Sequence, residues 1–277
     1  MSDLLLFYFP PVMFFFSVLP LAVYMTILFL VALWKRDNSI ADIGYGIGFI
    51  VMLILPYIGT ILFFSPKTVI QCIPFLLVCI WGVRLSLRIY LKHKGKPEDF
   101  RYASWRSEWK WVRTRSFFQV FALQGVIISL IAFPVLPLAY AFVFDYSTTL
   151  FVIGFLVWVK GFLFEVIADY QLDMFMKHSE NKGLLMTSGL WQYSRHPNYF
   201  GEAVMWWGIW IITTTIVPEI WYLTIISPLL ITFLLTKVSG VPLLEARMSQ
   251  YKDWQAYKNK TSVFIPWFPK KITSQSE

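Results

Sequence analysis

Charged residues are scarce in this chain. Only 14% of its 277 residues are Asp, Glu, Lys or Arg, whereas 57% are hydrophobic and 19% are aromatic. Soluble globular domains carry about 25% charged residues. The composition therefore excludes an ordinary soluble protein. It predicts an all-α polytopic membrane protein, because helices satisfy their backbone polar groups inside the bilayer.

Cysteine and histidine are also rare. The two cysteines, Cys72 and Cys79, lie two helical turns apart in one apolar run, too far apart for a disulfide along a helix. The three histidines, His93, His178 and His196, form no closely spaced cluster, so we expect no metal site. The chain also lacks a P-loop and a Ser-His-Asp motif.

Long apolar runs fill most of the chain, and each can cross a hydrocarbon core of ~30 Å as a helix. We expect about seven transmembrane helices, the first of them a retained span rather than a signal peptide. They are placed at residues 5–34, 40–64, 68–91, 117–144, 149–170, 199–217 and 219–239. We treat residues 1–277 as one integral membrane domain, with a cofactor-binding half at about 150–277.

Most of the 24 Lys and Arg residues fall in alternate loops, namely those after the first, third, fifth and seventh runs. The positive-inside rule then places the N-terminus outside and the C-terminus in the cytoplasm. The net charge of +8 is explained by orientation and by anionic lipid. We therefore expect no nucleic-acid partner.

The stretch SGLWQYSRHPNYFGEAVMWWG, residues 188–208, organises the rest of the chain. Pro197 fits the first turn of a helix, so we predict a helix start near residues 195–198. Arg195 and His196 would then lie at a helix N-terminus, which favours anionic groups. The alternative is an interfacial anchor of basic and aromatic side chains.

Several ionisable residues lie within the predicted spans. Asp42 is either a carboxylate near the membrane surface or an acid lining a cavity, and it is one candidate partner for Arg84. Glu165 and Asp169 share one helix face and need hydrogen-bond donors. The glycines of GYGIG, residues 44–48, are interpreted as sites of close helix packing rather than as a dinucleotide fingerprint.

Two polar segments mix basic and aromatic residues. GKPEDFRYASWRSEWKWVRTRS, residues 95–116, either lies on the headgroups or cradles a nucleotide, and it contains Lys96 and Arg106. In the tail, Leu244, Met248, Tyr251 and Trp254 are spaced as in one amphipathic helix.

The segments GLWQYSRHPNYFGEAVMWWG and LLEARMSQYKDWQAYKNKTSVFIPW resemble the C-terminal half of the steroid 5α-reductase family. The similarity extends to DIGYGIGF, WGVRLSLRIYLKHKGKPEDFRYASWR and FALQG, and is greatest to the bacterial branch, formerly of unknown function. Isoprenylcysteine carboxyl methyltransferases, in the same wider clan, share Arg-His-Pro-x-Tyr and a Glu-containing tail that ends in Ile-Pro.

The resemblance implies a cytoplasm-facing NADPH site and reduction of a carbon–carbon double bond conjugated to a ketone. It implies that Asn198 holds the nicotinamide end, that Glu202 and Trp206 line the same pocket and that Asp169 binds the nucleotide. The full set assigned to the cofactor is Arg84, Lys96, Arg106, Glu165, Asp169, Arg195, His196, Asn198, Tyr199, Glu202, Trp206, Glu245, Arg247 and Tyr257.

One departure concerns the substrate. The Gln-Glu pair with which animal steroid reductases grip the ketone is not found, and Trp81 stands where they have Tyr. Asp42, with Tyr45 or Tyr90, is our candidate proton donor. The expected substrate is a lipophilic enone entering from the bilayer, steroid or not, and we expect a monomer in a bacterial inner membrane, in contact with membrane lipids.

Two other functions fit the sequence. One is an S-adenosylmethionine-dependent methyltransferase of a lipid or prenylated thiol. The other is a lipid-binding membrane protein without enzymatic activity, against which the intramembrane Asp42, Arg84, Glu165 and Asp169 argue.

Overall fold

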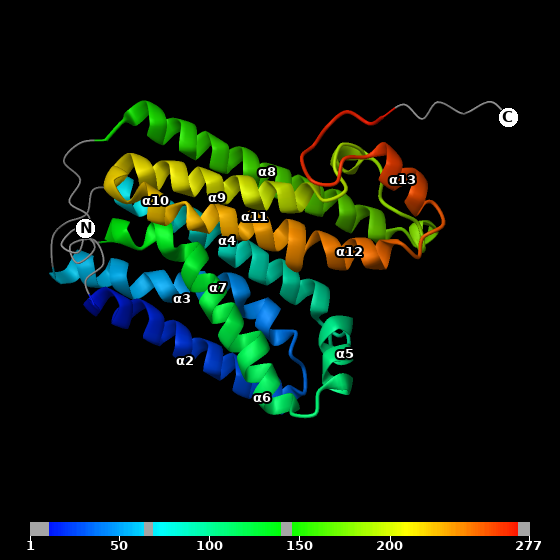
Figure 1. Ribbon diagram of the computed structural model, residues 1–277, viewed down its shortest axis with the longest axis horizontal. Coiled ribbons are helices and arrows are strands. Elements are labelled where there is room, and N and C mark those ends of the chain that lie inside the picture. The colour runs from blue at the N-terminus through cyan, green and yellow to red at the C-terminus, as the bar shows by residue number, and fades with distance from the viewer. Residues whose placement is uncertain (1–10, 64–68, 140–145, 271–277) are drawn as a thin grey trace. The chain divides into compact units, whose positions relative to one another are not determined.

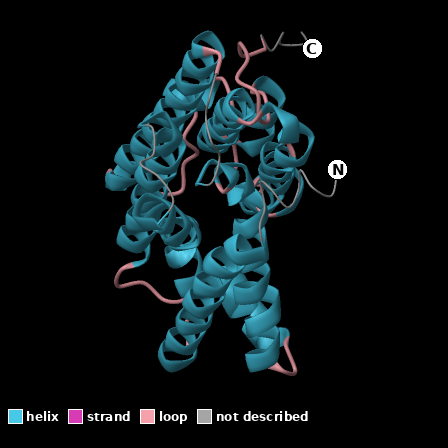
Figure 2. Ribbon diagram, turned by 90° about the vertical axis from the view of Figure 1, so that its left-hand side faces the viewer, coloured by secondary structure: helices cyan, strands magenta, loops and turns pink. Residues whose placement is uncertain are grey.

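The described part of the chain is helical and contains no β-strand (Figures 1 and 2). A computed structural model describes residues 11–63, 69–139 and 146–270. The expected beginning of the first span, residues 5–10, lies outside them. The chain divides into two compact units. Unit 1 comprises Met1–Ser147 and Thr213–Thr224, and unit 2 comprises Thr148–Ile212 and Ile225–Glu277.

Six helical segments of the described residues are long and apolar enough to cross a membrane, so the chain is an integral membrane protein. They are Phe15–Lys35, Ile40–Gly59, Ile70–His93, Val112–Val135, Thr148–Lys177 and Pro218–Met248. The expected span at 199–217 is not among them, because Glu202, three tryptophans and a run of threonines lower the mean hydropathy of that segment. The count of seven and the orientation stay predictions.

Unit 1 is built around helix α3 (Ile40–Phe63), which packs against α2, α4 and α7. The other helices of this unit are α2 (Pro11–Lys35), α4 (Val69–His93), α5 (Phe100–Glu108), α6 (Val112–Ser116) and α7 (Leu123–Ala132). Shorter turns are η1 (Phe117–Ala122), η2 (Phe133–Val135), η3 (Pro137–Ala139), η6 (Pro218–Ile220) and α10 (Trp221–Thr224). The turn η1 is π-helical and follows α6 and precedes α7 without a gap. The three elements therefore form one continuous helical segment.

The three glycines near the start of α3 explain how it packs against three neighbours. A Cβ at Gly44 would meet Leu28 of α2, one at Gly46 would meet the carbonyl of Gly82 in α4, and one at Gly48 would meet Ile128 of α7. Residues two positions apart on a helix point in different directions, so each of the three glycines faces a different neighbouring helix. The interpretation of GYGIG as a packing motif is confirmed.

Unit 2 contains the pair of long helices α8 (Thr148–Lys177) and α9 (Pro197–Ile216, whose last residues belong to unit 1) and the C-terminal segment. The C-terminal elements are α11 (Ile226–Phe233), η7 (Leu234–Val238), α12 (Val241–Met248) and α13 (Trp254–Lys260). Between α8 and α9 lie η4 (Ser179–Asn181) and η5 (Gly189–Gln192). The predicted helix start near residues 195–198 is confirmed, because α9 begins at Pro197.

Two sequence-based boundaries were wrong. The fifth span, expected at 149–170, was ended too early, because α8 continues to Lys177 through residues most of which favour helix. The single amphipathic helix expected in the tail is two helices, α12 and α13. They are separated where Tyr251 N donates to Met248 O and Trp254 N to Tyr251 O in tight turns.

Glycines bring the backbones of α8 and α9 into contact. A Cβ at Gly201 would lie 2.6 Å from both Glu165 N and Gly161 O, and one at Gly208 would lie 2.6 Å from Trp158 N. Backbone atoms of two packed helices cannot give way as a side-chain tip can. Glu165 therefore lies where the backbone of α8 closely approaches α9 at Gly201.

We expect Gly201→Ala to lower the free energy of unfolding by about 1–3 kcal/mol, since its methyl group overpacks this contact. Gly59→Ala in α3 is the matched control, because no atom lies within 4 Å of a Cβ there. That change should be neutral or stabilising, since Ala favours a helix over Gly. Thermal unfolding in detergent measures both, and equal midpoints would contradict the close contact.

Candidate functional site

The loop that precedes α9 is fixed against the end of α8. Gln171 Oε1 accepts a 2.9 Å hydrogen bond from Leu190 N, and Trp191 Nε1 donates to Ala168 O at 3.0 Å. Gly189 adopts a positive φ of 63° and would clash with Gln171 if it carried a Cβ. These contacts place the chain so that α9 begins beside Asp169.

The residues that begin α9 are bonded to the C-terminal tail. Ser194 Oγ donates to Phe264 O at 2.8 Å and accepts from His196 N at 3.1 Å. Arg195 N donates to Ser262 O at 2.8 Å. Segments far apart in sequence thus form one short parallel bridge, between Ser194 and Ser262.

The Arg195 guanidinium is the centre of this connection, which we term the tail clasp (Arg195, Glu245, Trp254 and the carbonyls of Lys258 and Thr261). Its Nε donates to Glu245 Oε1 at 2.7 Å, and its Nη1 donates to Lys258 O at 3.0 Å and to Thr261 O. Its Cζ lies 5.6 Å from the centre of the Trp254 ring. Arg195 is buried, so these contacts bind α12 and α13 to the start of α9.

Two further bonds close the tail over the loop. Buried Tyr257 donates to Trp191 O at 2.6 Å, and Trp267 N donates to Tyr193 O at 2.9 Å. Burial raises the pKa of Tyr257 above its usual value, so its hydroxyl stays protonated and acts as a donor. The tail is therefore part of the site's architecture rather than a free surface helix.

The side chain of His196 is completely buried. Its ring stacks on Tyr199 at 5.7 Å, and Nε2 lies 3.5 Å from Glu245 Oε1. Neither ring nitrogen makes a hydrogen bond within the described chain. Burial lowers the pKa of His196 to about 4, against the opposing attraction of Glu245. The imidazole is therefore neutral at pH 7 and offers one donor and one acceptor.

The pKa of His196 makes stability depend on pH. Between the ordinary value of 6.5 and about 4, the unfolded chain binds a proton that the folded chain does not, so acidification favours unfolding. The full shift corresponds to about 3 kcal/mol. We expect His196→Gln to remove this part of the acid sensitivity, and His178→Gln, at an exposed position, to leave it unchanged. Unfolding midpoints between pH 7 and pH 4 provide the test.

Asn198, the second residue of α9, meets Asp169 of α8. Asn198 Nδ2 donates to Asp169 Oδ1 at 3.2 Å, while Asn198 Oδ1 is shielded from solvent without a hydrogen bond in the described residues. Asp169, Glu165 and Glu202 are all buried. Asn198 Oδ1 thus presents an acceptor atom, which suits a ligand that supplies an N–H or O–H donor.

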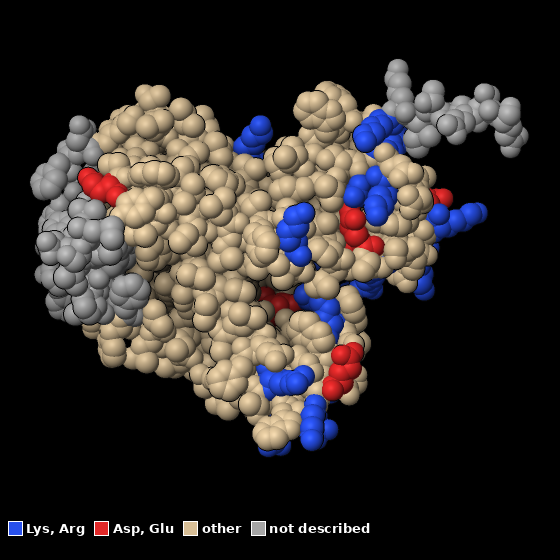
Figure 3. All heavy atoms as spheres, viewed as in Figure 1, with Lys and Arg blue, Asp and Glu red and all other residues tan. Residues whose placement is uncertain are grey.

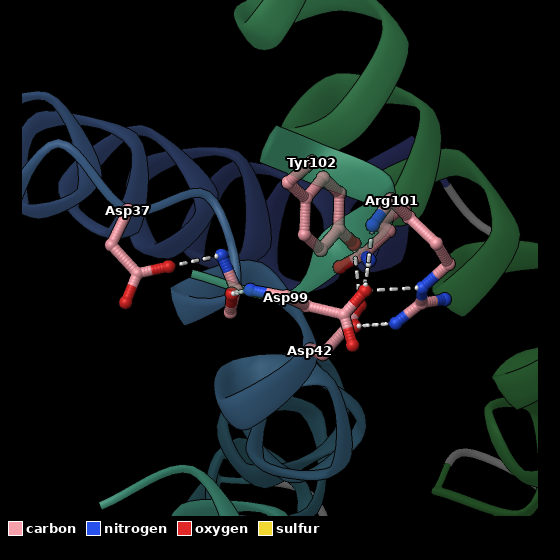
Figure 4. A network of polar contacts seen from close by, with 7 residues as sticks. Asp37, Asp42, Asp99, Arg101 and Tyr102 are labelled. Atoms are coloured by element: carbon pink, nitrogen blue, oxygen red, sulfur yellow. Dashed lines mark hydrogen bonds and ion pairs between the residues drawn. The ribbon is translucent and has the colours of Figure 1, made fainter. Parts of the chain in front are cut away.

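Unit 1 contains a separate polar network, where α3 begins and α5 crosses (Figure 4). Asp42 accepts hydrogen bonds from Arg101 Nη2 at 2.7 Å, Tyr102 Oη at 2.6 Å and Gln124 Nε2 at 3.0 Å. Arg84 is not among these partners. Burial and the neighbouring Asp42 raise the pKa of Tyr102, so the hydroxyl remains the donor. Asp42 thus joins α5 and α7 to α3.

Acids of the neighbouring loops are also bonded within unit 1. Asp99 Oδ1 accepts from Arg101 Nε at 2.8 Å, and Glu98 pairs with Arg106 at 2.9 Å. His93 Nε2 lies 2.7 Å from Asp37 Oδ2. Burial opposes the charge of Asp37, but hydrogen bonds from Ser39 and His93 lower its pKa. The network fixes loops 36–39 and 94–99 to each other.

The predicted site residues separate into two groups. Unit 1 holds Asp42, Tyr45, Arg84, Tyr90, Lys96 and Arg106. Unit 2 holds Glu165, Asp169, Arg195, His196, Asn198, Tyr199, Glu202, Trp206, Glu245, Arg247 and Tyr257. Within unit 2 the structure joins Asp169 to Asn198, and Arg195 to Glu245. Reasoning from sequence did not single out Arg101 and Tyr102 as partners of Asp42, and the basic and aromatic composition of residues 95–116 was the only signal for them. It also missed Ser194, which no pattern marks.

A model of one protein family matches residues 28–261, and its description is "Protein of unknown function (DUF1295)". The chain belongs to the DUF1295 family. The match covers the network of unit 1 and, in unit 2, Asp169, Asn198 and the tail clasp. The DUF1295 chain has no significant match among curated proteins or solved structures. Its described residues hold no group of three His, Cys, Asp or Glu side chains suited to a metal ion.

Proposed function

We propose that this DUF1295 protein is an NADPH-dependent reductase of a carbon–carbon double bond conjugated to a ketone, acting on a lipophilic substrate. The observation that carries the proposal is the buried junction of α8 and α9. There Asn198 is held by Asp169 and leaves its Oδ1 without a hydrogen bond in the described chain. The sequence resemblance to the steroid 5α-reductase family supplies the reaction type.

The residues of this junction fit the nicotinamide and ribose part of the cofactor. A carboxamide supplies an N–H donor for Asn198 Oδ1. A carboxylate has about four acceptor sites, so Asp169 and Glu165 would accept from ribose hydroxyls beside the bonds that they already make. Neutral His196 adds one donor and one acceptor without repelling either group. Three buried carboxylates do not suit phosphates, which need cations or N–H donors. Bound NADPH would supply a hydride for the β-carbon of the enone.

The protein's own task would be to orient the substrate and to polarise its ketone oxygen. One well-placed donor of this kind is worth about 3 kcal/mol. Of the three candidate donors, Asp42 is occupied by Arg101, Tyr102 and Gln124. Tyr45, whose ring packs against Phe49, and Tyr90 stay candidates, because each carries a hydroxyl proton. We also propose a bacterial inner membrane, with the cofactor site facing the cytoplasm.

The methyltransferase alternative has one observation in its favour. The two segments shared with isoprenylcysteine carboxyl methyltransferases, Arg195-His196-Pro197 and the Glu245 tail, are bonded to each other. A site for S-adenosylmethionine would use the same start of α9. The two functions differ in what is consumed, so one assay separates them.

The test uses the full chain in detergent with a panel of apolar enones and their saturated analogues. A reductase consumes NADPH with an enone and not with the saturated analogue. Methyl transfer from S-adenosylmethionine to a lipid thiol, with no NADPH consumption, would contradict the proposal.

A further inference from the structure

The segment Trp105–Arg115 connects two spanning helices at their ends, and we call it the tryptophan collar. The span that precedes it ends at His93, and the span that follows it begins at Val112. Hydrogen bonds of Asp37, Asn38 and Ser39 tie the end of α2 to His93, Glu98 and Asp99, in the segment that leads to the collar. Ends of membrane-spanning helices lie at the level of the lipid headgroups. The collar therefore lies at that level too.

Indole rings project from the collar. Trp111 is 66% exposed and Trp105 is 37% exposed. Trp105 and Trp109 stack with their ring centres 5.6 Å apart. An exposed tryptophan ring is unfavourable on a surface that faces water only. Its apolar ring and its N–H group suit the boundary between hydrocarbon and water.

The charges of the collar are unbalanced. Lys110, Arg113 and Arg115 are exposed and make no ion pair with the described residues. Among the acids nearby, Glu98 and Asp99 pair with Arg106 and Arg101. Glu108 accepts a 2.8 Å hydrogen bond from Ser104 Oγ and is the one acid of the collar, against the three basic residues Lys110, Arg113 and Arg115. On the face drawn in Figure 3, basic side chains lie over the region of α5 and α6, while the surface along the middle of α2 and α3 carries none.

We propose that the tryptophan collar binds anionic phospholipid headgroups of the membrane leaflet in which it lies. Lys110, Arg113 and Arg115 would meet the phosphates, and Trp105 and Trp111 would seat against the glycerol and upper acyl region. This binding does not depend on the reductase proposal, because the residues that carry it are not among those assigned to the cofactor: Lys110, Arg113, Arg115, Trp105 and Trp111.

The experiment titrates phosphatidylglycerol into the full chain in neutral detergent and counts bound lipid by native mass spectrometry. Arg113→Gln/Arg115→Gln should weaken binding about 30-fold, since each basic residue near an anionic surface contributes about 1 kcal/mol. Lys252→Gln/Lys260→Gln, which removes two exposed charges from the tail, is the matched control and should keep the affinity. Arg115→Gln alone should weaken binding about fivefold, should the double variant not fold.

Three results would overturn the proposal. Equal weakening by the tail variant would mean diffuse attraction to net charge. Equal affinity for phosphatidylcholine would mean apolar adsorption. Displacement of the lipid by glycerol phosphate at equal concentration would mean that the collar takes a soluble phosphate rather than a lipid.

Discussion

Arg195→Ala is expected to lower the free energy of unfolding by about 3–5 kcal/mol, because it leaves the Glu245 carboxylate without its buried partner. The change also removes two hydrogen bonds to backbone carbonyls and the contact with the Trp254 ring. The tail from α12 onward should then detach from the start of α9. Limited proteolysis is the direct measurement, with faster cleavage expected between residues 241 and 270.

Lys252→Ala is the control for this change, since it removes one positive charge from an exposed position on the same tail. Surface substitutions of this kind alter stability by about 0.5 kcal/mol or less. Arg195→Lys should fall between the two, because lysine keeps the charge but cannot reproduce the planar fork of donors. If Arg195→Ala and Lys252→Ala are cleaved equally fast, the tail clasp does not hold the tail.

Asn198→Ala is expected to weaken NADPH binding about tenfold to a hundredfold, which is the effect of losing one or two hydrogen bonds in a buried site. Among the described residues, Asp169 is the one hydrogen-bond partner of the Asn198 side chain, so the folded structure should lose little stability. Isothermal titration with the purified protein measures the dissociation constant. An unchanged unfolding midpoint in the absence of cofactor shows that the variant is folded.

Asn259→Ala provides the matched control for the amide. Asn259 is exposed in α13, where its Oδ1 accepts from Gln255. NADPH affinity should not change in this variant. If Asn198→Ala binds NADPH as tightly as the wild type, the Asn198 amide does not contact the cofactor.

The sequence predicted the helices well, because apolar runs long enough to cross a bilayer have few alternative structures. It also predicted the start of α9, since Pro197 has a fixed φ and no N–H. The glycines of α3 were interpreted correctly as packing sites. In each case the signal is local, a matter of residue type and spacing within one segment.

Partners far apart in the chain were not predictable. Arg195 and Glu245 are separated by 50 positions, and Asp42 and Arg101 by 59. Arg195 was expected to attract an anionic ligand and Asp42 to be a candidate partner of Arg84. The structure instead surrounds each with partners from another segment. A basic side chain beside a helix start has the same appearance in the sequence whether its partner is a ligand or a carboxylate, because only folding brings the partner close.

The end of α8 and the division of the tail also depended on tertiary structure. The long apolar run ends near residue 170, yet α8 continues, and Gln171 accepts a hydrogen bond from Leu190 N from within the helix. The amphipathic spacing from Leu244 to Trp254 continues across a break, because the clasp and the bond from Tyr257 to Trp191 set the direction of α13. Periodicity alone does not contain these contacts.

Thermal unfolding of the detergent-purified protein with NADPH, NADP, NADH or S-adenosylmethionine tests the central claim most directly. A ligand that binds only the folded state raises the free energy of unfolding by about 2.7 kcal/mol at a hundredfold excess over its dissociation constant. We predict that NADPH raises the unfolding midpoint and that S-adenosylmethionine leaves it unchanged. The NADPH effect should be lost in Asn198→Ala. A shift with S-adenosylmethionine alone, or with none of the four, would contradict the reductase.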